Sequence, residues 1–564
     1  MKSSTFRIGR ILAPTLLSVV AHAQTPPPVD AGKVLQETRP TLPQAPRKAP
    51  EPVIQQQEAA PLVLPAGQTL MVKAFRFEGA DFLGEAELQA AVADYLGRAL
   101  TMAEIEAAAD RVTALCRSHG YMVARAYVPK QDASSGTLII RVVAGKYGKV
   151  SLQNKSLVRD ALIGGYFAGL AGDKAVTRDD IERAMLLVGS LPGASLPKVS
   201  IAPGSAPETS DFDIEIQPGA RFNGYLLGDN YGSRYTGRNR ISLGASLNSP
   251  LALGDKLDFS GMGSDNGNLL NGRLAYSAPL GTSGLRGELA VTNSTYKLGD
   301  IYTPLDAKGA ASSVEASFSY PIERSRAQNL TASLGLVGRN LRDEVLSADA
   351  GNQVTTKKAY AATLGLMHER YGQMFGRDAY FSATGSLTWG HLDIDEAAMK
   401  ANNRAGANTV GDYGRANISL LGRLALTETL TTSATLSAQQ ALNRNLDSSE
   451  QLMISGTRDV ISYEQTVSGD SGYLANVELR YALPNLAGTQ HSVSVFADAG
   501  HINLYDASYT KTNKVNLSDA GLGYTLSWNS LFLRAQAAYA LGNWPASVLK
   551  DDHTRFLLQA GMVF

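Results

Sequence analysis

The chain has 564 residues, and its 52 lysine and arginine residues balance 52 aspartate and glutamate residues. This length exceeds one ordinary domain, and the balanced charge gives no electrostatic reason to expect a nucleic-acid partner. The single cysteine, Cys116, excludes an internal disulfide framework, a cysteine-based zinc site and an iron–sulfur cluster, and we expect no cofactor.

Residues 1–23 have the layout of a secretory signal peptide. A basic start precedes an apolar run over residues 11–20, and residues 21–23 give an Ala-x-Ala cleavage site. The alternative is a membrane anchor, but the run has about half of the roughly 20 apolar residues that a spanning helix requires. We therefore expect the mature chain to begin near Gln24, outside the cytoplasm.

Residues 24–69 are predicted to be a linker. Repeated prolines and three consecutive glutamines at residues 55–57 give a composition that cannot bury a core. Within it, residues 30–38 are compatible with two helical turns. Because short helices are marginal in water, a plain tether is the favoured alternative.

Residues 70–146 form one predicted unit in the order strand, helix, helix, strand, strand. Helical spacing covers residues 84–97, and Thr101 and Glu104 form a capping box that opens a second helix, which Gly120 ends. The predicted strands are Val72–Phe77, Tyr121–Val128 and Thr137–Val143.

Residues 147–218 repeat this order, with predicted strands at residues 149–152, 198–202 and 211–216 and helices at residues 158–167 and 178–190. Two successive βααββ units resemble a pair of POTRA domains. The segment RSHGYMVARAYVPKQ at residues 117–131 resembles the POTRA variant of two-partner secretion transporters. On this resemblance, the candidates for client binding are Tyr121, Arg125 and Tyr127.

Residues 219–564 alternate between apolar and polar side chains without a second continuous apolar run. A transmembrane barrel strand needs only about ten such residues, and about sixteen segments predict an antiparallel transmembrane β-barrel. A soluble sandwich would alternate in the same way. Three aromatic residues on the apolar faces favour the membrane: Tyr473, Tyr524 and Trp528. The last strand ends on Phe564, which resembles the assembly signal of outer-membrane barrels.

The segment DNYGSRYTGRNRISLGASLNSPLALGDKL at residues 229–257 resembles the opening barrel hairpin of two-partner secretion transporters. These TpsB-type, ShlB/FhaC/HecB-like proteins are the haemolysin and haemagglutinin exporters of the Omp85 superfamily. The resemblance implies a monomeric pore in the outer membrane with its N-terminal domains in the periplasm. It implies as partners a secreted TpsA-like protein, outer-membrane lipids, the barrel assembly machinery and periplasmic chaperones.

The sequence HSVSVFADAG at residues 491–500 contains the F-x-D-x-G pattern of the superfamily. Because side chains alternate along a strand, Phe496, Asp498 and Gly500 are predicted to face the lumen. A carboxylate there needs a partner. The resemblance implies an arginine in a V-R-G-[FY] motif, at the tip of an extracellular loop folded back into the pore.

The corresponding loop, about residues 441–471, keeps this motif only at Val460 and Tyr463. Ile461 stands where arginine is expected, and Ser462 stands where glycine is expected. The loop-to-wall salt bridge is therefore in doubt.

Three arrangements stay open for Asp498. Arg458, in the loop segment that begins at Gly456, is one substitute for the missing arginine, and lumen-facing Arg480, two residues after Glu478, is another. Alternatively, Asp498 is a hydrated lumen charge.

The sequence carries no enzyme signature. Neither an HExxH, a GxSxG nor a P-loop motif occurs. The most metal-like cluster is His391, Asp393 and Asp395, but this period-two spacing is more often the polar face of a strand. We expect neither a catalytic nor a metal site.

Three functions remain, and export of a dedicated partner, a large β-helical adhesin or cytolysin, is favoured. The alternative is an Omp85-type factor that assembles or inserts other outer-membrane proteins. A barrel enzyme or passive diffusion pore is third, because a plain pore does not need two POTRA units.

Overall fold

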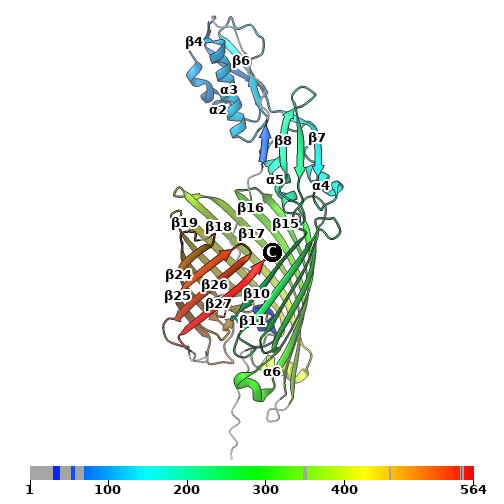
Figure 1. Ribbon diagram of the computed structural model, residues 1–564, viewed down its shortest axis with the longest axis vertical. Coiled ribbons are helices and arrows are strands. Elements are labelled where there is room, and N and C mark those ends of the chain that lie inside the picture. Colours follow the sequence, from blue (N-terminus) through cyan, green and yellow to red (C-terminus); the bar gives the residue numbers. More distant parts are fainter. Residues whose placement is uncertain are drawn as a thin grey trace, which may run out of the picture.

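The computed structural model describes residues 29–38, 53–56, 69–346, 352–456, 459–486, 488–545, 548 and 552–564. Two small α+β units stack on one end of a long barrel (Figure 1). None of the helices within these ranges is long and apolar enough to span a membrane. The predicted signal peptide and Arg458 lie outside the described residues.

The first unit packs two helices against a small sheet of spatial order β3-β6-β5, and β2 and β4 form a separate antiparallel pair. The predicted capping box is present, because the Thr101 backbone N–H donates to Glu104 Oε2 at 2.8 Å and the Thr101 side chain accepts from the Glu104 backbone N–H. The elements are β2 (Thr69–Val72), β3 (Ala74–Glu78), α2 (Glu85–Val92), η1 (Ala93–Tyr95), β4 (Arg98–Thr101), α3 (Met102–Ser118), β5 (Arg125–Tyr127) and β6 (Thr137–Val143).

The predicted strand Tyr121–Val128 is too long, because regular pairing covers only Arg125–Tyr127. The preceding residues join the two units: Met122 is buried in the core of the second unit, and the Arg178 backbone N–H donates to the Gly120 carbonyl oxygen at 2.8 Å. Packing between the units therefore replaces strand pairing at this point.

The second unit has a four-stranded sheet of order β1-β8-β9-β7. The linker strand β1 (Val53–Gln56) pairs in parallel with β8, and Ile54 packs against the hydrophobic core. The remaining elements are β7 (Lys146–Asn154), α4 (Asp160–Phe167), α5 (Arg178–Gly189), β8 (Lys198–Pro203) and β9 (Thr209–Ile216).

Sixteen antiparallel strands form a closed barrel, which confirms the predicted fold class. The strands are β10 (Phe222–Asp229), β11 (Arg240–Asn248), β12 (Lys256–Ser264), β13 (Leu269–Pro279), β14 (Arg286–Lys297), β15 (Lys308–Arg324), β16 (Gln328–Val345), β17 (Gln353–Met374), β18 (Arg377–Ile394), β19 (Gly411–Ala425), β20 (Leu430–Ala441), β23 (Ser471–Ala482), β24 (Gln490–Asn503), β25 (Lys514–Trp528), β26 (Leu531–Ala540) and β27 (Thr554–Val563). Shorter elements are α1 (Ala31–Glu37), η2 (Asp300–Leu305), α6 (Ala397–Ala405), β21 (Leu452–Met453) and β22 (Ser468–Gly469).

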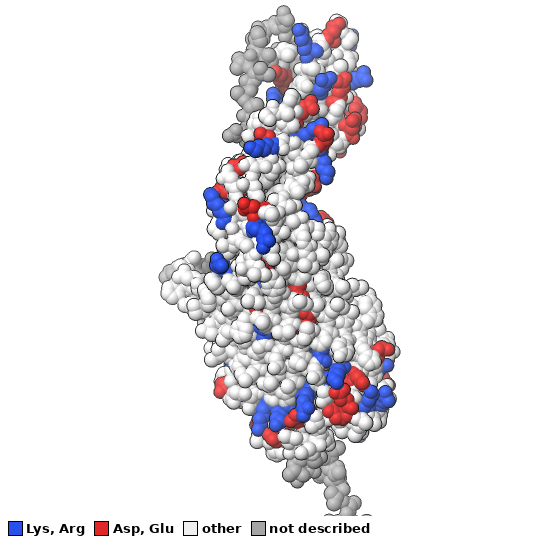
Figure 2. Space-filling model, turned by 90° about the vertical axis from the view of Figure 1, so that its right-hand side faces the viewer, with Lys and Arg blue, Asp and Glu red and all other residues white. Residues whose placement is uncertain are grey.

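The barrel wall is apolar outside and polar inside. In β11, Ile241 and Leu243 are exposed on the outer face, whereas Arg240 and Ser242 are buried inside. Charged side chains are sparse over the middle of the barrel and gather toward its far end and on the small units (Figure 2). This distribution fits a lipid-facing band between two aqueous ends.

The barrel closes between β10 and β27. Register pairs run from Tyr225 and Val563 to Asp229 and Gln559. Phe564 extends this ladder, because its backbone N–H donates to the Gly224 carbonyl oxygen at 2.9 Å. The terminal residue thus lies at the closing seam.

Candidate functional site: the pore and its closure

The F-x-D-x-G residues lie on the inner face of β24. Phe496 and Asp498 are buried, whereas their neighbours Val493 and Val495 are exposed on the outer face. A Cβ at Gly521 would lie 2.4 Å from the Phe496 ring, so glycine on β25 makes room for the aromatic side chain.

The loop between β20 and β23, residues 442–470, folds into the barrel and carries the short β21-β22 pair. Its tip is buried at Val460, Ile461, Ser462 and Tyr463. The Tyr463 ring packs against Trp544 with a centroid separation of 4.6 Å. The loop therefore blocks the lumen as a packed element.

Asp498 has no arginine partner among the described residues. Asn476, its register partner on β23, donates a hydrogen bond to Asp498 Oδ1. On the other side Asp498 is paired in register with Asp519 of β25. Arg480 forms an ion pair with Glu478 at 2.9 Å, so the alternative in which Arg480 neutralises Asp498 is not the arrangement in the structure.

Two wall residues that the sequence analysis missed contact the loop tip. Arg555 on β27 donates through Nη1 to the carbonyl oxygens of Gly456 at 3.0 Å and Ile461 at 3.1 Å. Asp519 accepts the Ser462 backbone N–H at 2.7 Å. Both contacts involve only backbone groups of the loop, which leave no motif in its sequence.

The stem of the loop is held by buried ion pairs on the opposite wall. Lys357 of β17 contacts Asp447 at 2.7 Å, and Arg415 of β19 contacts Glu450 at 2.9 Å. Arg339 of β16 also pairs with Glu450. A buried charge is stable only when it is paired, so these contacts fix the loop across the pore.

Two further ion pairs link the loop to the first extracellular hairpin loop. Glu464 is 3.4 Å from Arg234 and 3.0 Å from Arg238. Arg234 also donates its backbone N–H to Glu464 at 2.5 Å. The segment whose sequence resembles the family's opening hairpin thus contacts the pore loop directly.

Helix α1 lies inside the barrel between the wall and the pore loop. Its Val34 and Leu35 pack with Tyr296 and Leu341 of the wall, and the Ala31 backbone N–H donates to Asp343 at 2.9 Å. The predicted helical turns at residues 30–38 are thus formed, and Asp30 caps them by accepting the Lys33 backbone N–H at 3.0 Å. The plain-tether alternative is wrong for this segment.

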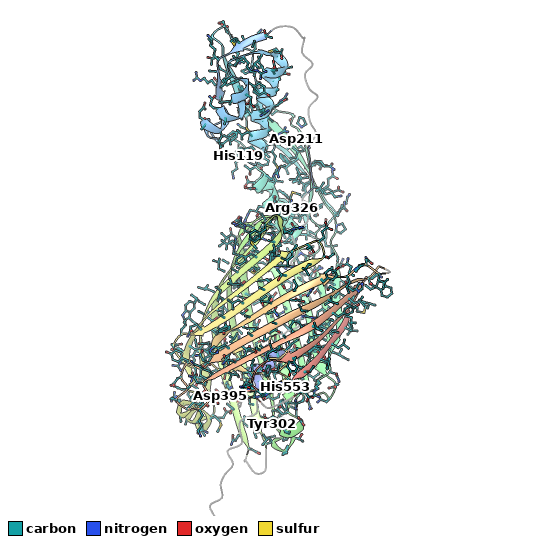
Figure 3. All side chains as sticks on the ribbon, turned by 90° about the vertical axis from the view of Figure 1, so that its left-hand side faces the viewer. His119, Asp211, Tyr302, Arg326, Asp395 and His553 are labelled. Atoms are coloured by element: carbon teal, nitrogen blue, oxygen red, sulfur yellow. The ribbon has the colours of Figure 1, made fainter. Side chains whose placement is uncertain are left out.

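The loop side of α1 is held by polar contacts. Gln36 donates to the Ser448 carbonyl oxygen at 2.7 Å, Ser448 Oγ donates to Asp30 at 2.7 Å, and Thr466 donates to Glu37. Helix α1 lies toward the end of the barrel away from the small units, where Tyr302 and His553 are labelled (Figure 3).

The client-binding candidates of the first unit differ in accessibility. Arg125 and Tyr127 are exposed on β5, which is an edge strand. Tyr121 is half-buried against Phe82, with ring centroids 4.1 Å apart. Tyr121 therefore has a packing role that its sequence context did not reveal.

The metal-like cluster has other partners. His391 contacts Asp412 at 2.6 Å, Asp393 pairs with Lys400, and Asp395 contacts Lys358 at 2.8 Å. Among the described residues, no group of three or more His, Cys, Asp or Glu side chains has an arrangement that could hold a metal ion.

Together the fold and the closed lumen define an outer-membrane transport barrel with two periplasmic domains. The model of the haemolysin secretion/activation proteins ShlB/FhaC/HecB matches residues 208–526, and that of the ShlB-type POTRA domain matches residues 70–145. The chain belongs to the ShlB/FhaC/HecB family. It is a two-partner secretion transporter that carries a secreted partner protein through the outer membrane, with its POTRA domains in the periplasm. The predicted family, location and transport function are confirmed.

Relatives and solved structures agree with this assignment. The heme/hemopexin transporter protein HuxB of Haemophilus influenzae (strain 86-028NP) is 24% identical over 78% of both chains. The outer membrane transporter CdiB of Dickeya dadantii (strain 3937) is 24% identical over 85% of this chain and 84% of its own. The structure of CdiB from Escherichia coli has a TM-score of 0.70 at 21% identity, covering 90% of this chain and 93% of that one.

Proposed function

We propose that this transporter exports one dedicated partner, a large β-helical adhesin or cytolysin, and that the structure is its closed resting state. The observation that carries the proposal is the double closure of the lumen by α1 and the pore loop. Both elements are held by side-chain and backbone contacts that can exchange without breaking the barrel ladder. Export then requires both to move.

Recognition of the client is proposed to occur at strand edges of the POTRA sheets. An extended segment can add to an edge through backbone hydrogen bonds, without strict demands on its sequence. In the first unit, β5 is an edge strand that bears Arg125 and Tyr127. The equivalent strand of the second unit, β8, is covered by β1 of the linker, so a client must displace β1 to bind there.

The chemistry of the pore supports transport rather than catalysis. Charged lumen residues that contact the pore loop, such as Lys357, Arg415 and Arg555, have partners within the protein, and we infer that the chain is not an enzyme. The chain has no nucleotide-binding motif in its sequence. We propose that folding of the client outside the cell supplies the free energy for export. We propose that the barrel is monomeric and surrounded by outer-membrane lipids. Periplasmic chaperones and the barrel assembly machinery are proposed to deliver it to the membrane.

Deletion of the gene tests this function. We expect one large protein to disappear from the surface and medium and to be trapped or degraded in the periplasm, as measured by quantitative mass spectrometry of each fraction. Re-expression of the chain should restore it. A general loss of outer-membrane barrels would instead support the assembly factor, the alternative that the family match disfavours.

A further inference from the structure

In the contact between the pore loop and the barrel wall, charged side chains of the wall bind backbone groups of the loop. Arg555 contributes a guanidinium to three loop carbonyl oxygens, those of Gly456, Ile461 and Tyr463, at 3.0, 3.1 and 3.4 Å. Asp519 contributes a carboxylate to the Ser462 backbone N–H. In these contacts the wall supplies the charged side chains, and the described loop residues Gly456, Ile461, Ser462 and Tyr463 take part through their backbone groups.

The loop side chain at the centre of this contact is apolar. Ile461 is buried in a cluster with Tyr231, Phe496, Ala538 and Leu557. An arginine would be costly there unless it found an anion, whereas isoleucine gains by burial. The apolar residue and the wall arginine are therefore complementary parts of one arrangement.

A small cavity also places Arg555 close to helix α1. This cavity of about 50 Å³ is lined by Arg555, by the loop residues Gly456 and Glu464, and by Gln36 and Glu37 at the end of α1. Bonds to a charged donor are strongest where water is scarce. Helix α1 and the loop pack around this cavity, so there is little room for water beside Arg555.

We propose that Arg555 is a positioning residue that holds the pore loop closed from the barrel wall. The inference rests on the proposed closed state. It concerns the loop alone, so it is tested without any client, and its failure is distinguishable from failure of the secretion experiment.

The test is the ionic conductance of the purified full-length protein in planar lipid bilayers. Arg555→Gln should raise the open probability by at least about tenfold, the change expected when one charge-assisted hydrogen bond is lost. The matched control is Arg534→Gln, since Arg534 is an inward-facing arginine of neighbouring β26 with no hydrogen bond to the loop in the part of the chain described. Heat-modifiable migration on gels reports that each barrel is assembled.

A rescue variant separates a lost loop anchor from general damage. In the Arg555→Gln background, Ile461→Arg places a guanidinium beside Phe496 and next to the Ser462–Asp519 contact, within reach of Asp519 and Asp498. We expect it to restore the closed state.

Two results would overturn the proposal. One is an Arg555→Gln protein that conducts like Arg534→Gln. The other is an open Arg555→Gln barrel that the loop arginine does not close. If Arg555→Gln does not assemble, Arg555→Lys takes its place, because lysine keeps the charge but lacks the planar fork of donors.

Discussion

Gly500 of β24 lies directly against Ile454 of the pore loop, so closely that a Cβ at Gly500 would fall 2.8 Å from the Cβ of Ile454. Real Cβ atoms do not approach so closely, so Gly500→Ala should push the loop out of place. Overpacking of this kind costs about 1–3 kcal/mol. We expect faster cleavage of the loop by protease added to whole cells. Gly422→Ala, where nothing lies within 4 Å, is the control and should leave cleavage unchanged.

Two substitutions of Asp498 should separate the effect of its carboxyl group on secretion from the effect of its shape. Asp498→Ala leaves the Asn476 amide without its acceptor, which costs about 1–3 kcal/mol for a buried polar group. Asp498→Asn keeps the shape and removes the carboxyl group that faces Asp519. We expect Ala to reduce secretion without lowering barrel abundance, and Asn to be milder. Equal export by the wild type, Asp498→Ala and Asp498→Asn would show that Asp498 does not anchor the closure and is a plain lumen charge.

The barrel could be predicted because its pattern is local. Alternation along each strand fixes which side chains face lipid, and the same count places Phe496 and Asp498 on the inner face, as the structure has them. The fold class needed this alternation, the two βααββ repeats and, to favour a membrane barrel over a soluble sandwich, the aromatic residues on the apolar faces.

The closure of the pore could not be predicted because its contacts are nonlocal. Arg555 lies about a hundred residues from the loop tip and binds carbonyl oxygens, which every sequence contains. The pairing of Arg480 with Glu478 wins over Asp498 because the two residues are neighbours on one face of β23. The Pro-rich composition likewise predicted the linker but not the surface that β1 covers.

Strand β1 can be locked onto β8 by a disulfide. Gln55 and Ser200 are register partners across the parallel pair. The double variant Gln55→Cys, Ser200→Cys should form the bond in the oxidising periplasm. If β8 is a docking edge, secretion should fall under oxidising conditions and recover with reductant.

The background for this experiment is simple because Cys116 is the only native cysteine and is buried. Burial raises the pKa of the Cys116 thiol, so it should react slowly with maleimide in the folded protein. Ser200→Cys with Asp213→Cys, a register pair within the same sheet, is the control disulfide. Secretion that falls equally with both disulfides would show that rigidity of the sheet matters, not occupation of its edge.

Gly32 tests whether α1 closes the pore. A Cβ at this glycine would lie 2.4 Å from Ser448 Oγ and 2.7 Å from the Ser449 backbone nitrogen, so no side chain fits between helix and loop. Leucine has a higher helix propensity than glycine, so Gly32→Leu should not destabilise helix α1 itself. Any displacement of α1 then results from the clash with the pore loop. We expect a rise in bilayer conductance and in protease access to residues 29–38. Gly164→Leu, in α4 where a Cβ meets open space, is the matched helical control. Wild-type conductance in Gly32→Leu would show that the pore loop alone seals the barrel.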